Sequence, residues 1–254
     1  MPPSQPMTDQ DNPSHLQRDG EFATTHWSVV LLAGGAASPG ADQALEHLCQ
    51  SYWYPLYAYV RRQGHTSTDA QDLTQDFFAR FLQREYFKLA DPNRGRFRTF
   101  LLSSLKHFLT NQWRKEQAAK RGGGQNVLSW DEQTAEGRYL AEDVSGFTPE
   151  SIYEKRWAVT LLEKALGQLR ARCVANGKAA MFDALKPSLL GDTMIEGYDA
   201  IATRLGSTPG AVRVAMHRFR EEYRELLRDE VARTVASPAD VDAELRALVA
   251  ALRN

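Results

Sequence analysis

Hydrophobic and polar positions follow a helical period over most of the chain. Apolar residues recur every three or four positions from about 41 to 62, 68 to 83 and 96 to 119. The same spacing returns at about 150–175 and 178–190, then in two short segments after Gly197 and in a last one opened by Ser237 and Pro238. No segment alternates strictly as a half-buried β-strand does. The pattern predicts an all-α protein.

The predicted helix over 68–83 has two chemically distinct faces. Thr68, followed by Gln71, resembles the capping box that opens a helix. At 100° per residue, one half of this helix is apolar and carries Leu73, Phe77, Phe78, Phe81 and Leu82. The other half carries the polar side chains Asp69, Asp72, Asp76, Arg80 and Gln83. We expect the apolar half in a core and the acidic half on the surface.

The near-zero net charge of the chain hides one strongly basic and one strongly acidic segment. The formal net charge is only -1, from 31 Lys and Arg against 32 Asp and Glu. Residues 84–121 hold ten basic and three acidic side chains, whereas 125–155 hold seven acidic and two basic ones. The predicted order is a disordered tail over 1–22, a helical domain over 23–121, a flexible acidic linker over 122–148, a second helical domain over 149–235 and a C-terminal helical extension over 236–254.

Composition excludes several classes of protein. A hydrophobic fraction of 43% is sufficient for packed cores. No segment approaches the length of a membrane span, and the first residues lack the features of a secretion signal, so we expect a cytoplasmic location and no membrane partner. The two cysteines, Cys49 and Cys173, lie far apart and outside any metal-binding spacing, which indicates idle thiols, no disulfide, no metal site and no cofactor.

The strongest local motif begins at Gly197. A short apolar stripe runs from Tyr198 to Leu205, Gly206 supplies a tight turn, and Thr208 with Pro209 begins a second helix. The second stripe contains Val212, Ala215, Met216, Phe219 and Tyr223. Its outward face groups Arg213, His217 and Arg220. Two helices joined in this way predict a helix-turn-helix that reads DNA, since arginine pairs with guanine and with phosphate.

A second basic surface follows the turn-rich loop that ends at Gly95. Phe97, Phe100, Leu101, Leu105 and Phe108 form a core stripe, and Ser103, Lys106, His107, Thr110 and Arg114 occupy the opposite face. Trp113 lies at the edge of that face. Cations beside an aromatic ring are typical of a surface for single-stranded nucleic acid, although a basic amphipathic helix with a tryptophan at its edge has the same pattern.

With these motifs in hand, the chain resembles the extracytoplasmic-function group of sigma factors from about Thr24 to Val235. The segment from Asp69 to Phe78 is similar to the family's region 2.2, and that from Arg96 to Phe108 to its regions 2.3 and 2.4. The motif from Gly197 is similar to the helix-turn-helix of region 4. Phe100 stands where tryptophan is usual, His107 where asparagine is common, and residues 181–194 depart from the family's pattern.

The resemblance implies a role without catalysis, in which the protein binds core RNA polymerase and promoter DNA. It implies polymerase binding, on the beta-prime clamp helices, by Asp69, Asp72, Gln75 and Asp76. It implies −10 element binding by Asn93, Arg94, Arg96, Arg98, Lys106, His107, Thr110, Trp113 and Arg114. It implies −35 element binding by Ser207, Thr208, Arg213, His217, Arg218 and Arg220. The beta flap is a further expected contact, an anti-sigma factor or other regulator is common in the family, and the acidic linker is expected to cover the basic surfaces in the free protein.

Three other interpretations remain open from the residues alone. One of them, a protein-interaction scaffold, predicts no DNA contact by the Arg213 face. A helix-turn-helix regulator that acts without polymerase explains the motif at Gly197, but not the acidic face over 69–83 or the basic surface after it. A metal-dependent enzyme would use Asp69, Asp72 and Asp76, yet no second carboxylate or histidine cluster accompanies them and Arg80 shares their face. The extension after 236 is expected to pack on the second domain or to make a regulatory contact.

Overall fold

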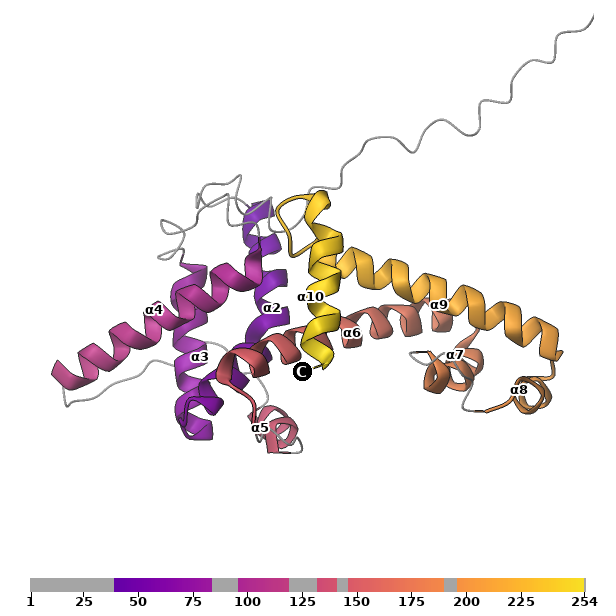
Figure 1. Cartoon of the computed structure of the whole chain (residues 1–254), viewed down its shortest axis with the longest axis horizontal. Coiled ribbons are helices and arrows are strands. Elements are labelled where there is room, and N and C mark those ends of the chain that lie inside the picture. The colour runs from indigo at the N-terminus through magenta and orange to yellow at the C-terminus, as the bar shows by residue number, and fades with distance from the viewer. Residues whose placement is uncertain (1–38, 84–95, 119–131, 141–145, 190–195, 254) are drawn as a thin grey trace, which may run out of the picture.

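The computed structural model describes residues 39–83, 96–118, 132–140, 146–189 and 196–253, all built from helices (Figure 1). Within these ranges the only β pairing is an isolated antiparallel bridge between Arg96 and Val235. The turn-rich loop that ends at Gly95 and most of the expected linker lie outside the described residues. No helix in the described part is both long enough and apolar enough to span a membrane.

Helices α2 (Pro39–Arg62), α3 (Ser67–Leu82) and α4 (Phe97–Ala118) form one bundle around an aromatic core. Tyr52, Phe77, Phe81, Phe97 and Phe108 are all essentially inaccessible to solvent. The rings of Tyr52 and Phe97 meet edge to face with centroids 5.0 Å apart, a geometry that aromatic pairs prefer. The apolar half expected for the helix over 68–83 is therefore confirmed as core.

Helix α3 begins slightly before the residue that the sequence motif indicated. Thr66 is its N-cap, and the Thr66 hydroxyl accepts a hydrogen bond from the Asp69 amide at 3.1 Å. The predicted capping box at Thr68 and Gln71 is wrong, because Thr68 already lies in the first turn. A threonine oxygen at the N-cap satisfies one of the amides that the first turn leaves without a helical partner.

A helix occurs inside the segment expected to be linker. Helix α5 (Glu132–Leu140) buries Ala135 and Tyr139, and Glu136 binds Arg61 of α2 at 2.7 Å. The sequence of α5 has no strong apolar period, which is why pattern reasoning assigned no helix there. Tertiary contacts with α2 stabilise a nine-residue helix that would be marginal in isolation.

Helix α6 (Pro149–Ala175) connects the two ends of the molecule. Thr148 caps it, with its hydroxyl accepting from the Ser151 amide, and Pro149 occupies the first turn. With 27 residues it is about 40 Å long. Its first half packs along α2 in the aromatic core, whereas Leu169 and Cys173 in its second half belong to another buried cluster.

The second cluster surrounds a group of helices at the far end of α6 (Figure 1). These are α7 (Ala179–Leu185) with the 3-10 turn η3 (Lys186–Ser188), then α8 (Tyr198–Leu205) and α9 (Pro209–Ala232). Helix α9 has 24 residues and is not the short element that the sequence suggested. It returns along α6, so that Val212 lies in the second cluster and Val231 in the aromatic core.

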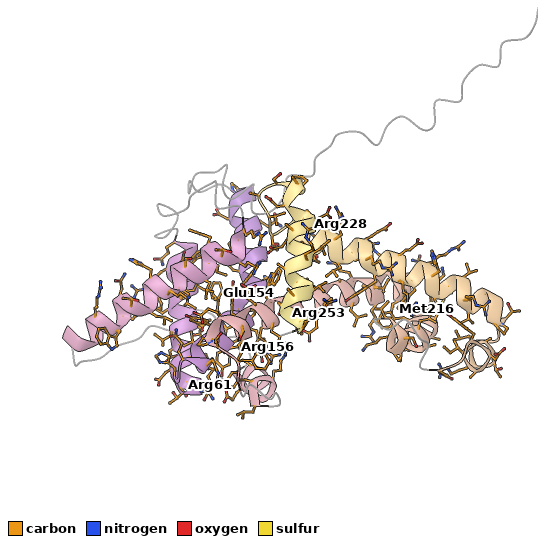
Figure 2. The ribbon with its side chains drawn as sticks, in the orientation of Figure 1. Arg61, Glu154, Arg156, Met216, Arg228 and Arg253 are labelled. Carbon is orange, nitrogen blue, oxygen red and sulfur yellow. The ribbon has the colours of Figure 1, made fainter. Side chains whose placement is uncertain are left out.

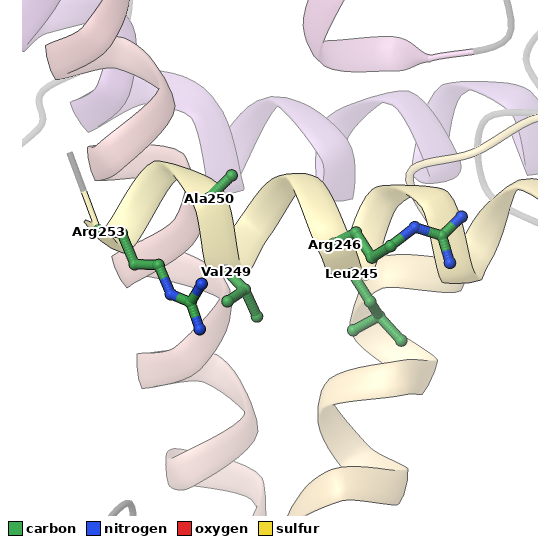
Figure 3. Close-up of a pocket in the computed structure, with 5 residues that line it drawn as sticks. All are labelled: Leu245, Arg246, Val249, Ala250 and Arg253. Atoms are coloured by element: carbon green, nitrogen blue, oxygen red, sulfur yellow. The ribbon is translucent and has the colours of Figure 1, made fainter.

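The C-terminal extension packs against both long helices. After the 3-10 turn η4 (Pro238–Asp240), helix α10 (Val241–Arg253) contacts α6 and α9. Its buried face holds Val241, Glu244, Leu248 and Ala251, and Leu245 packs partly buried against the same core. Figure 3 shows a shallow hollow on α10, lined by Leu245, Arg246, Val249, Ala250 and Arg253.

The packing links the parts that the sequence divided into two domains. The aromatic core includes Ile152 and Trp157 of α6, Val231 of α9 and Leu248 of α10, in addition to α2, α3 and α4. Consequently α6 and α9 each contribute to both buried clusters. Segments that are distant in sequence share one core here. The sequence-based division into two helical domains at residue 149 does not describe this shared core.

Trp157 tests how far the stability depends on this shared core. It is fully buried, and the Arg98 guanidinium lies 4.5 Å from its ring centroid. We expect Trp157→Ala to lower the free energy of unfolding by about 3 to 5 kcal/mol, because it removes a large buried ring. Trp113→Ala is the matched control, since Trp113 is 61% exposed, and it should change stability by no more than about 0.5 kcal/mol. Urea unfolding followed by circular dichroism measures the stability of both variants. Equal losses of stability would contradict the assignment of Trp157 to the shared core.

Candidate polymerase and nucleic-acid interfaces

A well-defined turn joins α8 to α9. Gly206 ends α8 in the left-handed conformation at φ 60°, and the Ser207 amide donates to the Ala202 carbonyl at 2.9 Å. Thr208 then caps α9 by accepting from the Ala211 amide at 3.2 Å, and Pro209 follows at the first helical position. These contacts use the glycine, threonine and proline that the sequence motif singled out. The turn fixes the direction in which α9 leaves α8.

The apolar stripes of α8 and α9 face each other, as the sequence predicted. Ile201, Ala202, Val212, Met216 and Phe219 are buried, and Figure 2 labels Met216 within this group. The Phe219 ring meets Phe182 of α7 edge to face at 5.7 Å. The contact with α7 fixes the rotation of α9 about its axis and therefore decides which residues remain on its outer face.

Most of the residues expected to bind the −35 element are exposed to solvent. Ser207, Thr208, Arg213, His217 and Arg218 are exposed. The Arg213 guanidinium lies 5.1 Å from the ring centroid of Tyr198, a contact that holds the side chain beside the turn. His217 Nδ1 lies 3.3 Å from the Glu221 carboxylate. Five of the six predicted residues are therefore exposed, along the turn and the first three turns of α9.

Arg220 differs from the other five. Its side chain is half-buried and donates to the Ser188 carbonyl of η3 at 2.9 Å. The sequence placed it with Arg213 and His217 because helical periodicity gives only the angle of a residue, not the neighbours that surround it. In this conformation Arg220 joins α9 to η3.

The predicted −10 surface divides into an exposed half and a paired half. Along the second half of α4, His107, Thr110, Trp113 and Arg114 are exposed. Lys106 is also exposed, but its ammonium lies 2.7 Å from the Glu150 carboxylate at the start of α6. Asn93 and Arg94 lie outside the described residues.

An open cleft of about 580 Å³ adjoins this exposed half. Its walls include Tyr59 of α2, Gln63 just after that helix, Leu73 of α3, Lys106 and Trp113 of α4, and Glu150 of α6. Aromatic and hydrogen-bonding groups in one cleft are suited to an unstacked base, which needs a flat apolar contact and a polar edge. The cleft is a feature that sequence reasoning did not find, since its walls come from four helices.

The paired half is the first turn of α4. Arg98 is buried and donates to both carboxylate oxygens of Glu244 in α10, at 2.6 and 3.2 Å. It also binds Glu154 of α6, which Figure 2 labels. Arg96 lies 3.2 Å from the same Glu244 carboxylate. Arg98 is not available to DNA in this conformation, whereas the side chain of Arg96 is paired with Glu244 and remains 36% exposed.

Glu154 and Glu244 are functional candidates that sequence reasoning missed. Burial raises the pKa of the Glu154 carboxyl, although Arg98 opposes this effect. Glu244 has no solvent-accessible surface, yet it occurs between Val241 and Leu248 on the buried face of α10. A charge at such a position is a signal that the sequence does contain, because an acid in an apolar stripe needs a buried partner.

The acidic face of α3 is largely on the surface. Asp69 and Asp72 are exposed, and Gln75 and Asp76 are half-buried. Asp76 pairs with Arg80 at 2.9 Å and accepts a hydrogen bond from Gln112 of α4 at 2.8 Å. Asp69 accepts from the Thr66 hydroxyl at 2.8 Å as part of the cap. Of the four, Asp72 is the one that is exposed and takes no part in the cap or in the pairs with Arg80 and Gln112.

The groups that a metal-dependent enzyme would need are not assembled in the described part of the chain. No group of three or more histidine, cysteine, aspartate or glutamate side chains there is placed to hold a metal ion. Cys49 and Cys173 are free and buried. Burial raises the pKa of both thiols, with Glu46 and Glu222 adding to the effect.

Comparison with known proteins identifies the first bundle. Residues 48–119, which span most of α2 and all of α3 and α4, match the model of the family Sigma-70 region 2. This part of the chain is therefore a sigma-70 region 2 domain, the module of a non-enzymatic family that acts in transcription initiation with RNA polymerase. The chain matches no curated protein and no solved structure.

Two glycines of the α8–α9 unit test the geometry of the turn. We expect Gly206→Ala to destabilise the protein by about 1 to 2 kcal/mol, because a Cβ disfavours the left-handed conformation. Gly210→Ala serves as its control, since Gly210 lies in the first turn of α9 and a Cβ there meets no atom. This second change should stabilise by about 0.5 kcal/mol through the higher helix propensity of alanine. Thermal unfolding of the two variants measures the change in stability. A loss of stability in Gly210→Ala as large as that in Gly206→Ala would contradict the left-handed conformation assigned to Gly206.

Proposed function

We propose that the protein is a sigma factor of the extracytoplasmic-function type, which directs core RNA polymerase to promoters by reading a −35 and a −10 element. The region 2 match over residues 48–119 carries this proposal. The α8–α9 unit supports it independently, because five polar or basic residues lie exposed at the start of a capped helix. The surfaces expected to bind polymerase and DNA have different chemistry and lie on different helices.

Polymerase binding is assigned to the acidic face of α3. Asp69, Asp72, Gln75 and Asp76 would contact the beta-prime clamp helices, with Asp72 the most available of the four. Asp76 is already paired with Arg80, so its contribution to polymerase binding requires either exchange of that partner or a shared contact. The expected beta-flap contact would come from the helices around α8 and α9.

Reading of the −35 element is assigned to the first turns of α9. A helix in the major groove presents its N-terminal residues to base edges. Arg213 has the length and the fork geometry for a guanine, and Arg218 and the Thr208 hydroxyl are placed to contact phosphates. Arg220 is reassigned by its bond to Ser188, and we propose that it positions α9 against η3 instead of contacting DNA.

Recognition of the −10 strand is assigned to the exposed half of α4. His107, Thr110 and Arg114 would follow the phosphates, and Trp113 beside the adjoining cleft would stack on an unpaired base. In the free protein Glu150 covers Lys106 at 2.7 Å, and hydrogen bonding from Lys106 lowers the pKa of the Glu150 carboxyl. This pairing supports acidic covering of the basic surface, although the acids near 131 and 142 lie outside the described residues.

A helix-turn-helix regulator that works without polymerase is the alternative. It accounts for α8 and α9 but assigns no role to a region 2 domain. Run-off transcription separates the two, using purified core polymerase, this protein and a library of randomised promoters. Transcripts that start downstream of two shared motifs would establish the sigma function. Failure of core polymerase to bind the protein or to initiate with it would favour the regulator.

Arg213 gives the sharpest mutational test of −35 reading. On a promoter selected in this way, Arg213→Ala should lower the affinity of the polymerase complex by about 1 to 3 kcal/mol and relax the preference at one −35 position, as expected for loss of a bidentate contact to a base. Arg170→Ala is the matched control, because Arg170 is an exposed arginine on α6, outside the α8–α9 unit. Competition binding against promoters substituted at single positions measures the effect, and an unchanged preference would argue against direct reading by Arg213.

A further inference from the structure

Two guanidinium groups converge on one carboxylate at the beginning of α4. Glu244 Oε1 and Oε2 accept from Arg98 Nε and Nη2 at 2.6 and 3.2 Å, and Arg96 Nε lies 3.2 Å from Oε2. Glu244 is completely buried in this contact. The arrangement is the fork with which arginine binds either a carboxylate or a phosphate.

Backbone contacts also hold the start of α4 against the segment between α9 and α10. The Phe97 amide donates to the Thr234 carbonyl at 3.1 Å, beside the bridge between Arg96 and Val235. The Tyr153 hydroxyl donates to the Arg98 carbonyl at 3.0 Å. The segment between α9 and α10 therefore lies directly on the first turn of α4, and α10 carries Glu244 into the space above the two arginines.

Stability alone gives a weak reason for a charge at position 244. The neighbours of Glu244 on the buried face of α10 are Val241, Leu248 and Ala251. A buried ion pair is often no more stabilising than apolar side chains of similar volume, because both charges lose their hydration. Glu154 already provides one carboxylate for Arg98. With the second carboxylate, two arginines and two glutamates balance in charge, and only the Arg96 side chain remains partly exposed, at 36%.

We propose that Arg96 and Arg98 form a phosphate-binding site for the promoter strand and that Glu244 of α10 occupies this site in the free protein. The inference rests on the proposed function, which assigns both arginines to the −10 surface. The site opens when the start of α10 leaves α4. This movement removes the Glu244 carboxylate and the backbone contacts together. The exposed half of α4 remains accessible in both states, so DNA can make its first contacts before α10 moves.

Glu244→Gln tests the site in the full-length protein, with a labelled single-stranded DNA of random sequence as the probe. If about nine free molecules in ten are closed, opening raises the affinity about tenfold. The slope of log affinity against log salt should steepen by about 0.7 for each phosphate newly bound. Fluorescence anisotropy over a salt series measures both quantities.

Glu230→Gln is the matched control. Glu230 is also a buried glutamate, 2% exposed, and it binds Arg233 near the end of α9. Its substitution removes a buried carboxylate without freeing Arg96 or Arg98, so DNA affinity should stay at the wild-type value. Equal affinities for wild type, Glu244→Gln and Glu230→Gln would overturn the phosphate site. Equal gains in both variants would also overturn it, because general loosening would then explain the effect.

Hydrogen exchange of the wild-type protein removes any dependence on the folding of a variant. Addition of single-stranded DNA should accelerate exchange in residues 241–253, because binding displaces α10, while residues 107–114 become protected. Unchanged or slower exchange in α10 would overturn the proposal. If Glu244→Gln gains DNA affinity and α10 exchanges faster, but core polymerase does not initiate with the protein, the phosphate site is supported and the sigma function is contradicted. If initiation succeeds without the affinity gain and the faster exchange, only the phosphate site is contradicted.

Discussion

Burial of the Arg98 guanidinium requires helices from three distant parts of the chain. The group lies 4.5 Å from the centroid of the Trp157 ring and binds Glu154 of α6 and Glu244 of α10. A buried arginine remains charged and must be both paired and hydrogen-bonded. The first turn of α4 therefore depends on α6 and α10, and the packing of those helices depends on Arg98. This mutual requirement extends the aromatic core beyond the region 2 domain.

The same requirement relates the two surfaces assigned to DNA. Helix α6 contacts α2 in its first half and the helices around α8 in its second, and α9 returns over the same distance. The α8–α9 unit is thus connected to the region 2 domain by packed helices, not by a free linker alone. Any opening at Arg98 would loosen the contact of α10 with α6 and α9 as well. A change at the −10 surface therefore has a physical route to the other end of the molecule.

Sequence reasoning succeeded where local chemistry decides the structure. The cap at Thr208, the turn at Gly206 and the burial of Val212 and Phe219 follow from residue types and helical period. It failed where a partner distant in sequence decides. Helix α5 forms against α2, and Arg220 turns to η3, although neither outcome is written in the local pattern. Glu244 is intermediate, since its position in an apolar stripe indicates a buried partner but cannot say that the partner is Arg98.

The two kinds of ion pair that cover the basic surface differ in how readily they open. The pair between Lys106 and Glu150 is exposed on both sides, so salt screens it and its contribution to stability is small. The Arg98 and Glu244 pair is buried, and screening by dissolved ions affects it little. A polyanion can therefore displace Glu150 by simple competition, whereas displacement of Glu244 also requires that α10 leaves its apolar contacts. The outer half of α4 would engage DNA first, and the energy of that engagement would then be available to move α10.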